Sequence, residues 1–175
     1  AVEVDISDRA QMKAAAARVL ETLGPCTGLV AGAAHLENPH APENQDPDEW
    51  DRILATNLTG TFLTLQHFGQ QMLDLGRGSI VTLGSITALN ASPLVAYGPT
   101  KAALNRMMRS VAIDLKDRGI IIGLVHPGWV QTDMSGPNAA ITPEESARGI
   151  YTITMDWTLA RSGEFYKWNG EPHPW

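Results

Sequence analysis

The sequence predicts an α/β domain in which a doubly wound parallel sheet lies between two layers of helices. Short apolar segments alternate with amphipathic segments of helical length, and strands that alternate with helices in this way form parallel βαβ units. The chain has 175 residues, of which 43% are hydrophobic, and a chain of about this length can bury a core of its own. We therefore expect residues 1–175 to form a single domain with three layers, α/β/α.

Five short segments are the candidate strands. Residues 2–6 alternate apolar and polar side chains, which is typical of the end of a strand. Residues 28–31, 79–83 and 120–125 are apolar runs of the kind found in buried parallel strands. An aromatic segment, residues 165–168, comes last and precedes a turn.

Four segments carry the start and stop signals of helices. The first begins at Asp8 and ends before Gly24. The second begins at Asp46 and keeps apolar residues at three- and four-residue steps to Leu73, so it is predicted to be one long amphipathic helix. The other two cover residues 97–115 and a segment opened by residues 142–145.

The composition excludes several classes of protein. Asp and Glu outnumber Lys and Arg by 19 to 13, whereas nucleic-acid-binding surfaces are basic. The single cysteine, Cys26, excludes a disulfide scaffold. The longest bulky apolar run, residues 120–125, is far shorter than the ~20 residues of a membrane span, and no signal-peptide pattern opens the chain. We therefore expect a protein of the cytoplasm.

A metal site is not expected. The five histidines, at positions 35, 40, 67, 126 and 173, do not show a metal-ligand spacing such as His-x-x-x-His. We interpret them as surface or loop residues.

Tyr97 and Lys101 form a candidate catalytic pair. They lie four residues apart at the start of a predicted helix, so both side chains project from one face. A phenol ordinarily has a pKa of about 10, and a lysine cation one turn away lowers it toward the range that general acid–base catalysis needs. Taken alone, the pair is also compatible with an ordinary helix surface.

Ser85 is a candidate partner for this pair. It follows the strand predicted at residues 79–83 through Gly84, and open α/β sheets bind their ligands just beyond the carboxyl ends of parallel strands. A serine in this place could simply cap a turn. Its position nevertheless brings a hydroxyl to the edge of the sheet where a ligand is expected.

These residues give the chain a resemblance to the short-chain dehydrogenase/reductase family of classical type. The family carries a strand-end serine followed by Tyr-x-x-x-Lys, which Ser85, Tyr97 and Lys101 match. It also carries an asparagine in the preceding long helix, which Asn57 matches. Four residues in the family's order, on the expected elements, make the resemblance specific.

Further matches extend the resemblance over essentially the whole chain. After the next strand the family carries Pro-Gly and then a threonine, as Pro127, Gly128 and Thr132 do here. The tail, residues 162–175, resembles more narrowly the C-factor-like branch of the family. The resemblance implies a Rossmann-type fold.

The resemblance also implies a role for each catalytic residue. Tyr97 is expected to give a proton to a carbonyl oxygen, or to take one from the alcohol, while a nicotinamide cofactor exchanges hydride. Lys101 is expected to lower the pKa of Tyr97 and to bind the nicotinamide ribose. Ser85 polarises the substrate oxygen, and Asn57 holds a water that relays the proton by way of Lys101.

Four more residues are implied as cofactor contacts. Thr132 and the backbone at Pro127 and Gly128 are expected beside the carboxamide of NAD or NADP. Asp5 resembles the family aspartate beside the adenine ring. The residue that discriminates between the two cofactors follows the family's second strand, which the sequence does not contain, so the preference stays open.

The family's phosphate-binding unit has no counterpart in the sequence. In the family, a Gly-rich turn in a first βαβ unit binds the pyrophosphate at a helix N-terminus, but residues 2–5 match the third strand. Residues 27–33 imitate the Gly-rich fingerprint, yet no strand precedes them and no helix promptly follows, so they fit better as the fourth strand. We therefore expect a Rossmann-type sheet that is incomplete at the N-terminus, with residues 2–6 unpaired and with further residues before Ala1.

The sequence favours an NAD(P)-dependent oxidoreductase that interconverts a small aldehyde or ketone and its alcohol. Aromatic residues gather in the last fifth of the chain, where they are expected to form core or the contacts of a homodimer or homotetramer. The alternative is a non-catalytic signalling or assembly protein on the same scaffold. The missing fingerprint and the C-factor-like tail suggest this alternative.

Overall fold

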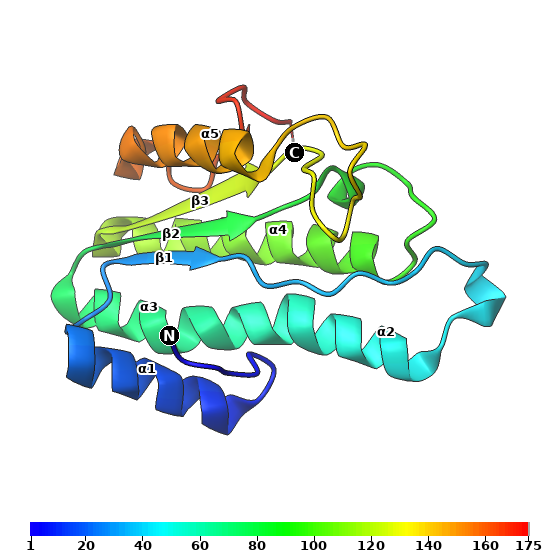
Figure 1. Ribbon diagram of the computed structural model, residues 1–175. Helices are drawn as coiled ribbons and strands as arrows, with labels where there is room; N and C mark the ends of the chain where they lie inside the picture. The colour runs from blue at the N-terminus through cyan, green and yellow to red at the C-terminus, as the bar shows by residue number, and fades with distance from the viewer. Residues whose placement is uncertain (175) are drawn as a thin grey trace.

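A computed structural model describes residues 1–174 as a three-layer α/β/α domain around one parallel sheet (Figure 1). Neighbouring strands pair in the order β1-β2-β3-β4, and every pair is parallel. The predicted α/β class and four of the five predicted strands are confirmed. The strands are β1 (Gly28–Ala31), β2 (Gly78–Leu83), β3 (Ile120–His126) and β4 (Phe165–Lys167).

The helices begin and end close to the predicted signals. Asp8 caps the first helix by accepting the N–H groups of Ala10 and Gln11, and Thr142 with Glu145 forms the capping box of the last one. No helix among residues 1–174 has both the length and the apolar composition to cross a membrane. The α-helices are α1 (Arg9–Leu23), α2 (Pro47–Leu54), α3 (Thr61–Leu75), α4 (Tyr97–Leu115) and α5 (Pro143–Met155).

The prediction of one long helix from Asp46 to Leu73 is wrong in one respect. The helical path is continuous, but between α2 and α3 it widens into a π-helical turn, Ala55–Gly60. A π turn is rare, occurs mostly within α-helices and is frequently found at functional sites. Here it contains Asn57, whose side chain is completely buried.

Residues 2–6 are not a strand, which corrects the prediction of a strand there, but they are unpaired, as the sequence predicts. They have no hydrogen-bonded neighbour strand, because β1 at the edge of the sheet pairs only with β2. Instead the segment packs on the helices: Ile6 lies so close to Gly60 that a Cβ at that glycine would be 2.7 Å from the isoleucine side chain. Together with α1 and α3 the segment lines an apolar cavity of about 540 Å³.

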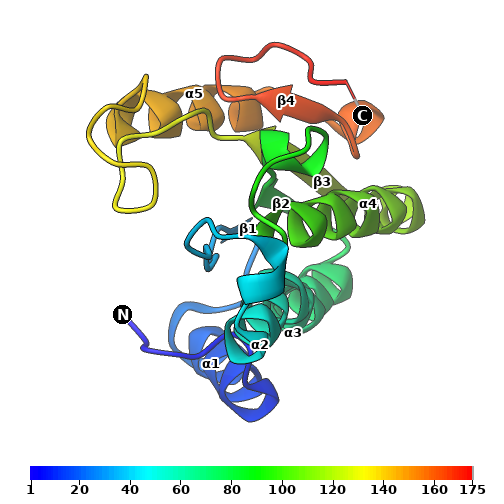
Figure 2. The same ribbon diagram turned by 90° about the vertical axis from the view of Figure 1, so that its right-hand side faces the viewer.

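The core lies on both faces of the sheet. On one face, α3 and α4 bury apolar side chains against the even-numbered residues of β2 and β3, and α5 covers the opposite face, as the end-on view shows (Figure 2). Since all the strands are parallel, their carboxyl ends meet at one edge of the sheet, on the right in Figure 1. The main buried contacts are Met72, Ile80, Leu104, Met108 and Ile122 on the first face, and Val81, Val125, Ile153 and Trp157 on the second.

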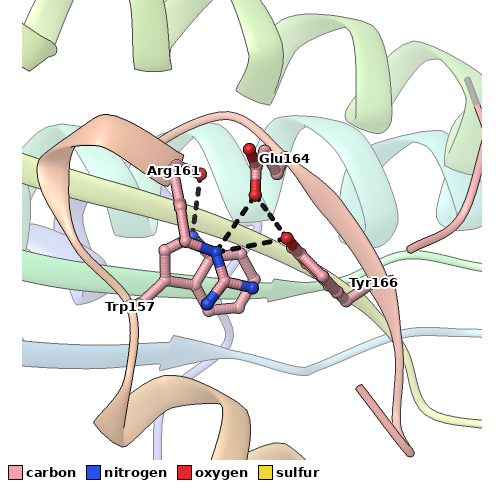
Figure 3. Close-up of polar contacts among 4 residues, drawn as sticks. All are labelled: Trp157, Arg161, Glu164 and Tyr166. Atoms are coloured by element: carbon pink, nitrogen blue, oxygen red, sulfur yellow. Dashed lines mark hydrogen bonds and ion pairs between the residues drawn. The ribbon is translucent and has the colours of Figure 1, made fainter. Parts of the chain in front are cut away.

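A polar cluster fastens the segment after α5 to the last strand. The Glu164 carboxylate accepts hydrogen bonds from the Tyr166 hydroxyl and from Nε of Arg161, and Trp157 Nε1 donates to the Arg161 carbonyl at 2.9 Å (Figure 3). The Trp157 and Tyr166 rings meet edge to face at 5.4 Å. These aromatic residues of the tail are therefore part of the core.

The close approach of two turns predicts that Gly119→Ala lowers the free energy of unfolding by a large amount. Gly119 has φ +77°, and a Cβ there would overlap the Gly76 carbonyl oxygen, whereas Gly136, with φ +74°, has open space around it. Both substitutions place alanine in the left-handed region, which costs about 1–2 kcal/mol. We expect Gly119→Ala to lower the free energy of unfolding by about 1–3 kcal/mol more than Gly136→Ala. Urea denaturation measures the difference, and equal costs would contradict the close contact between the two turns.

Candidate active site

Three of the predicted catalytic side chains meet at the carboxyl edge of the sheet. Ser85 follows the end of β2 by two residues, and Tyr97 and Lys101 lie on the first turns of α4, which packs against β3 and the 3₁₀ turn after Ser85 (Figure 1). The spacing of Tyr97 and Lys101 places them on one helix face, as the sequence predicts. The sheet then brings the serine to that face.

Ser85 is buried, with 8% of its surface exposed, and caps the 3₁₀ turn Ile86–Ala88. Its Oγ accepts the backbone N–H of Thr87 at 3.2 Å and lies 2.8 Å from the Thr87 hydroxyl. Its interaction with the Tyr97 side chain acts to lower the pKa of the phenol. The serine thus caps a turn and also influences the tyrosine.

The Tyr97 phenol stays protonated at neutral pH. Burial raises its pKa above the ordinary value of 10.0, because a phenolate is poorly solvated there, and the interaction with Ser85 opposes this only in part. The net shift is therefore opposite to the predicted lowering of the Tyr97 pKa, since desolvation is its largest cause. The phenol of Tyr97 therefore keeps its proton in the folded protein.

The Lys101 ammonium is buried beside the tyrosine. Its Nζ lies 5.5 Å from the centroid of the Tyr97 ring and donates a hydrogen bond of 3.0 Å to the carbonyl of Leu83. Burial lowers the pKa of Lys101 to about 8. The lysine is thus mostly cationic at neutral pH, and it ties α4 to the last residue of β2, two residues before Ser85.

Asn57 connects the π turn with the elements around the site. Its Oδ1 accepts the backbone N–H of His35 at 2.7 Å, and its Nδ2 donates to the His35 carbonyl at 2.9 Å and to Thr100 Oγ1 at 3.2 Å. Thr100 in turn donates to the Tyr97 carbonyl at 2.7 Å. Both donors of the amide are therefore used within the protein, and the link from Asn57 to the catalytic helix runs through Thr100.

Glu37 is a residue of the site that no sequence pattern selects. It lies in the loop after β1 and is only 2% exposed, and its two carboxylate oxygens accept the backbone N–H groups of Ala96 and Tyr97 at 2.7 and 2.8 Å. An isolated glutamate in a polar, proline-containing loop carries no recognisable signal. Only the fold brings it to the start of α4.

The residues predicted to bind the nicotinamide follow β3. The Pro127 carbonyl accepts the Ser146 hydroxyl at 2.6 Å, which fixes the loop to α5. Gly128 has φ +91°, and a Cβ there would lie 2.5 Å from Ile141, so this backbone needs glycine. Thr132 is exposed, with only a 3.4 Å contact from its hydroxyl to the Val130 carbonyl, which leaves its side chain accessible to a ligand.

Asp5 lies apart from these residues in the chain segment beside α1 and α3. Its carboxylate accepts the N–H and the hydroxyl of Ser7 at 2.9 and 2.7 Å, an Asx turn that precedes α1. Its assignment to the adenine end of the cofactor stays a prediction. Asp5 is exposed, so its carboxylate is accessible.

The described residues fit one end of a nicotinamide dinucleotide better than the other. Tyr97, Lys101 and Thr132 offer hydrogen-bonding groups where the ribose and carboxamide are expected. For the pyrophosphate, β1 does not lead into a Gly-rich turn and helix: the loop after it runs to Pro47, where α2 begins. Residues 27–33, which resemble the Gly-rich phosphate-binding motif, therefore belong to β1 and the residues on either side of it.

One histidine departs from the expectation of a surface or loop position. His126 is the last residue of β3, and burial is the main cause that lowers its pKa to about 4, so it is neutral. Its ring meets that of His173 edge to face at 6.1 Å. Across residues 1–174, no three His, Cys, Asp or Glu side chains are grouped as metal ligands.

Comparison with known proteins agrees with this fold, which is that of a Rossmann-type α/β protein. The NADPH-bound carbonyl reductase from chicken fatty liver superposes with a TM-score of 0.88 and 28% identity, covering 99% of this chain and 76% of that one. The family profile named short chain dehydrogenase matches residues 1–141. The chain belongs to this family.

Two curated relatives illustrate the range of similar proteins. C-signal from Myxococcus xanthus is 40% identical over 93 residues, 53% of this chain and 56% of C-signal. Galactitol 2-dehydrogenase from Rhizobium johnstonii is 30% identical over 162 residues, 91% of this chain and 61% of that protein. The chain therefore spans less than two thirds of the length of each of these relatives. The predicted family membership is confirmed.

The buried Lys101 predicts a specific dependence of stability on pH. Its pKa is about 8 in the folded protein against an ordinary value of 10.5, so between these pH values the unfolded chain binds a proton that the folded one has released. Stability attributable to this group therefore rises with pH, by about 2 kcal/mol between pH 7 and roughly pH 9.5. We expect Lys101→Met to lose this rise.

Urea unfolding of the wild type and of Lys101→Met, at pH 7 and at roughly pH 9.5, measures this rise in stability. The difference between wild type and variant removes the contributions of other titrating groups. An identical pH dependence in the two proteins would show that the ammonium is solvated in the folded state.

Proposed function

We propose that the protein is an NAD(P)-dependent oxidoreductase that interconverts a small carbonyl compound and its alcohol. The observation that carries the proposal is the joint placement of Ser85, Tyr97 and Lys101 at the carboxyl edge of the sheet. Membership in the short chain dehydrogenase family supports it. When bound, the nicotinamide supplies or accepts the hydride.

Each side chain has a task that its environment supports. The protonated Tyr97 phenol donates its proton to the carbonyl oxygen of the substrate, which becomes the alcohol hydroxyl. The negative charge then left on the phenolate is stabilised by the Lys101 ammonium, 5.5 Å from the ring centroid. Ser85, which caps the turn next to Tyr97, donates to the same substrate oxygen and orients it.

The surroundings of the site support a substrate with an apolar body. Large hydrophobic side chains are exposed in the two loops that follow β2 and β3, where a substrate next to Ser85 is expected. Exposed apolar groups near a site are typical of ligand contacts. These side chains are Ile86, Leu89, Trp129 and Met134.

Several finer features belong to the same proposal. Either NAD or NADP can serve as the cofactor, with Tyr97, Lys101, Pro127, Gly128 and Thr132 on its nicotinamide side and Asp5 at its adenine end. The protein is proposed to act in the cytoplasm, and to assemble as a homodimer or homotetramer. Light scattering of the purified protein measures the assembly.

A second candidate is a signalling or assembly role without turnover. Two observations favour it: the similarity to C-signal, and the loop that takes the place of a Gly-rich turn and helix after β1. The two candidates differ in a single measurable property, the binding and use of a nicotinamide cofactor.

Removal of the Tyr97 hydroxyl tests the catalytic assignment. We expect Tyr97→Phe to lower kcat for carbonyl reduction by about 10²–10⁴-fold, because the proton donor is lost, while the affinity for the cofactor changes little. Tyr151→Phe is the matched control, since Tyr151 is 64% exposed on α5. Steady-state assays with NADH and NADPH give both values. If Tyr97→Phe keeps most of the activity, the assignment is wrong.

Cofactor titration separates the two candidate functions. The chain has five tryptophans, so binding of NADH or NADPH is expected to quench their emission by energy transfer, with saturation in the micromolar range. Thr132→Ala is expected to weaken binding severalfold. Absence of any saturable quenching with both cofactors would favour the non-catalytic role.

A further inference from the structure

The start of α4 is capped by a residue far away in the sequence. α1, α2 and α5 are each capped by the side chain of the residue directly before them, namely Asp8, Asp46 and Thr142. The corresponding residue of α4 is Ala96, which has no side chain able to cap. The Glu37 carboxylate takes this place by accepting the N–H groups of Ala96 and Tyr97.

The contact between Glu37 and the start of α4 is buried. Glu37 is 2% exposed and Ala96 is completely buried, so water cannot readily replace the two hydrogen bonds. The first N–H groups of a helix have no partner within the helix, and its N-terminus carries partial positive charge. A carboxylate satisfies both N–H groups at once and is itself stabilised by that charge. The first helical residue held in this way is Tyr97.

Glu37 also closes a ring of hydrogen bonds around the first turn of α4. Asn57 binds both backbone groups of His35, two residues before Glu37. Glu37 binds the N–H of Tyr97, and Thr100 binds the Tyr97 carbonyl and the Asn57 amide. The Tyr97 backbone is thus held at its N–H and at its carbonyl by two routes that meet at Asn57.

A helix that needed only a cap could obtain it from a serine or aspartate at position 96. The use of a distant carboxylate instead makes the position of Tyr97 depend on the loop after β1. We propose that Glu37 is a positioning residue for Tyr97. Its carboxylate fixes the first turn of α4 against this loop and so determines the position of the Tyr97 phenol relative to Ser85. The catalytic consequence rests on the proposed function of Tyr97, whereas the fixation of the turn does not.

Amide hydrogen exchange tests the fixation without any assay of activity. In Glu37→Gln the side chain keeps its length and one acceptor, and in Glu37→Ala both acceptors are lost. We expect exchange to accelerate about tenfold or more at one of the Ala96 and Tyr97 amides in Glu37→Gln and at both in Glu37→Ala, with the core of α4 unchanged. Glu43→Gln, an exposed residue of the same loop, is the control and should exchange like the wild type. Unchanged exchange at both amides in Glu37→Gln overturns the proposal.

Steady-state kinetics with NADH or NADPH and a small aldehyde test the consequence. A displaced phenol lowers the rate of proton donation, so we expect kcat to fall about tenfold or more in Glu37→Gln while KM for the cofactor stays within about threefold. Glu43→Gln should match the wild type in both constants. If the exchange accelerates but kcat is unchanged, Glu37 is only a helix cap and the positioning role is refuted.

The outcomes for the two proposals can be told apart. If the wild-type protein turns over no aldehyde or ketone with either cofactor, the proposed oxidoreductase function fails, and the exchange data alone decide whether Glu37 fixes the turn. If Glu37→Ala does not fold, the exchange and kinetic measurements on Glu37→Gln decide the test. A lower urea midpoint with unchanged exchange at Ala96 and Tyr97 counts against the proposal.

Discussion

The geometry of the site depends on one buried amide, that of Asn57. It satisfies both backbone groups of His35 and reaches Thr100 on α4, so it joins the π turn, the loop after β1 and the catalytic helix. A regular α-helix turns by a fixed angle per residue, and the wider π turn changes the direction in which later side chains point. The widened path from Ala55 to Gly60 accompanies this bridging position of Asn57. Loss of the amide would leave the partly buried N–H and carbonyl of His35 without these partners.

The parallel sheet supplies the second constraint. Because β1, β2 and β3 all end at one edge, the loops that carry Glu37, Ser85 and Gly128 emerge together. Lys101 reaches back from α4 to the last carbonyl of β2, which places the helix relative to Ser85. The same packing removes water from the phenol and the ammonium. Desolvation therefore sets both pKa values, raising that of Tyr97 and lowering that of Lys101, and it keeps the proton on the tyrosine.

Much of the fold was predictable because local signals and tertiary structure agree. The apolar runs became β1, β2 and β3, and the caps at Asp8 and Thr142 begin helices as expected. Two predictions failed for lack of tertiary information. Residues 2–6 have the alternation of a strand, but a strand exists only beside a hydrogen-bonded neighbour. The π turn replaces part of the regular helix at Asn57, whose contacts with His35 and Thr100 are tertiary and leave no local pattern.

Local sequence patterns specify the class of the fold and the identity of the reactive side chains. Alternating strand and helix patterns lead to a parallel sheet, and Tyr97 and Lys101 share a helix face whatever the rest of the chain does. The protonation of these groups and the part played by Glu37 arise only in the folded molecule, since burial and contacts across 60 residues of chain leave no local pattern. The physical reason is that pKa values and the capping of a helix by a distant loop depend on what surrounds a group in space, which one-dimensional spacing does not encode.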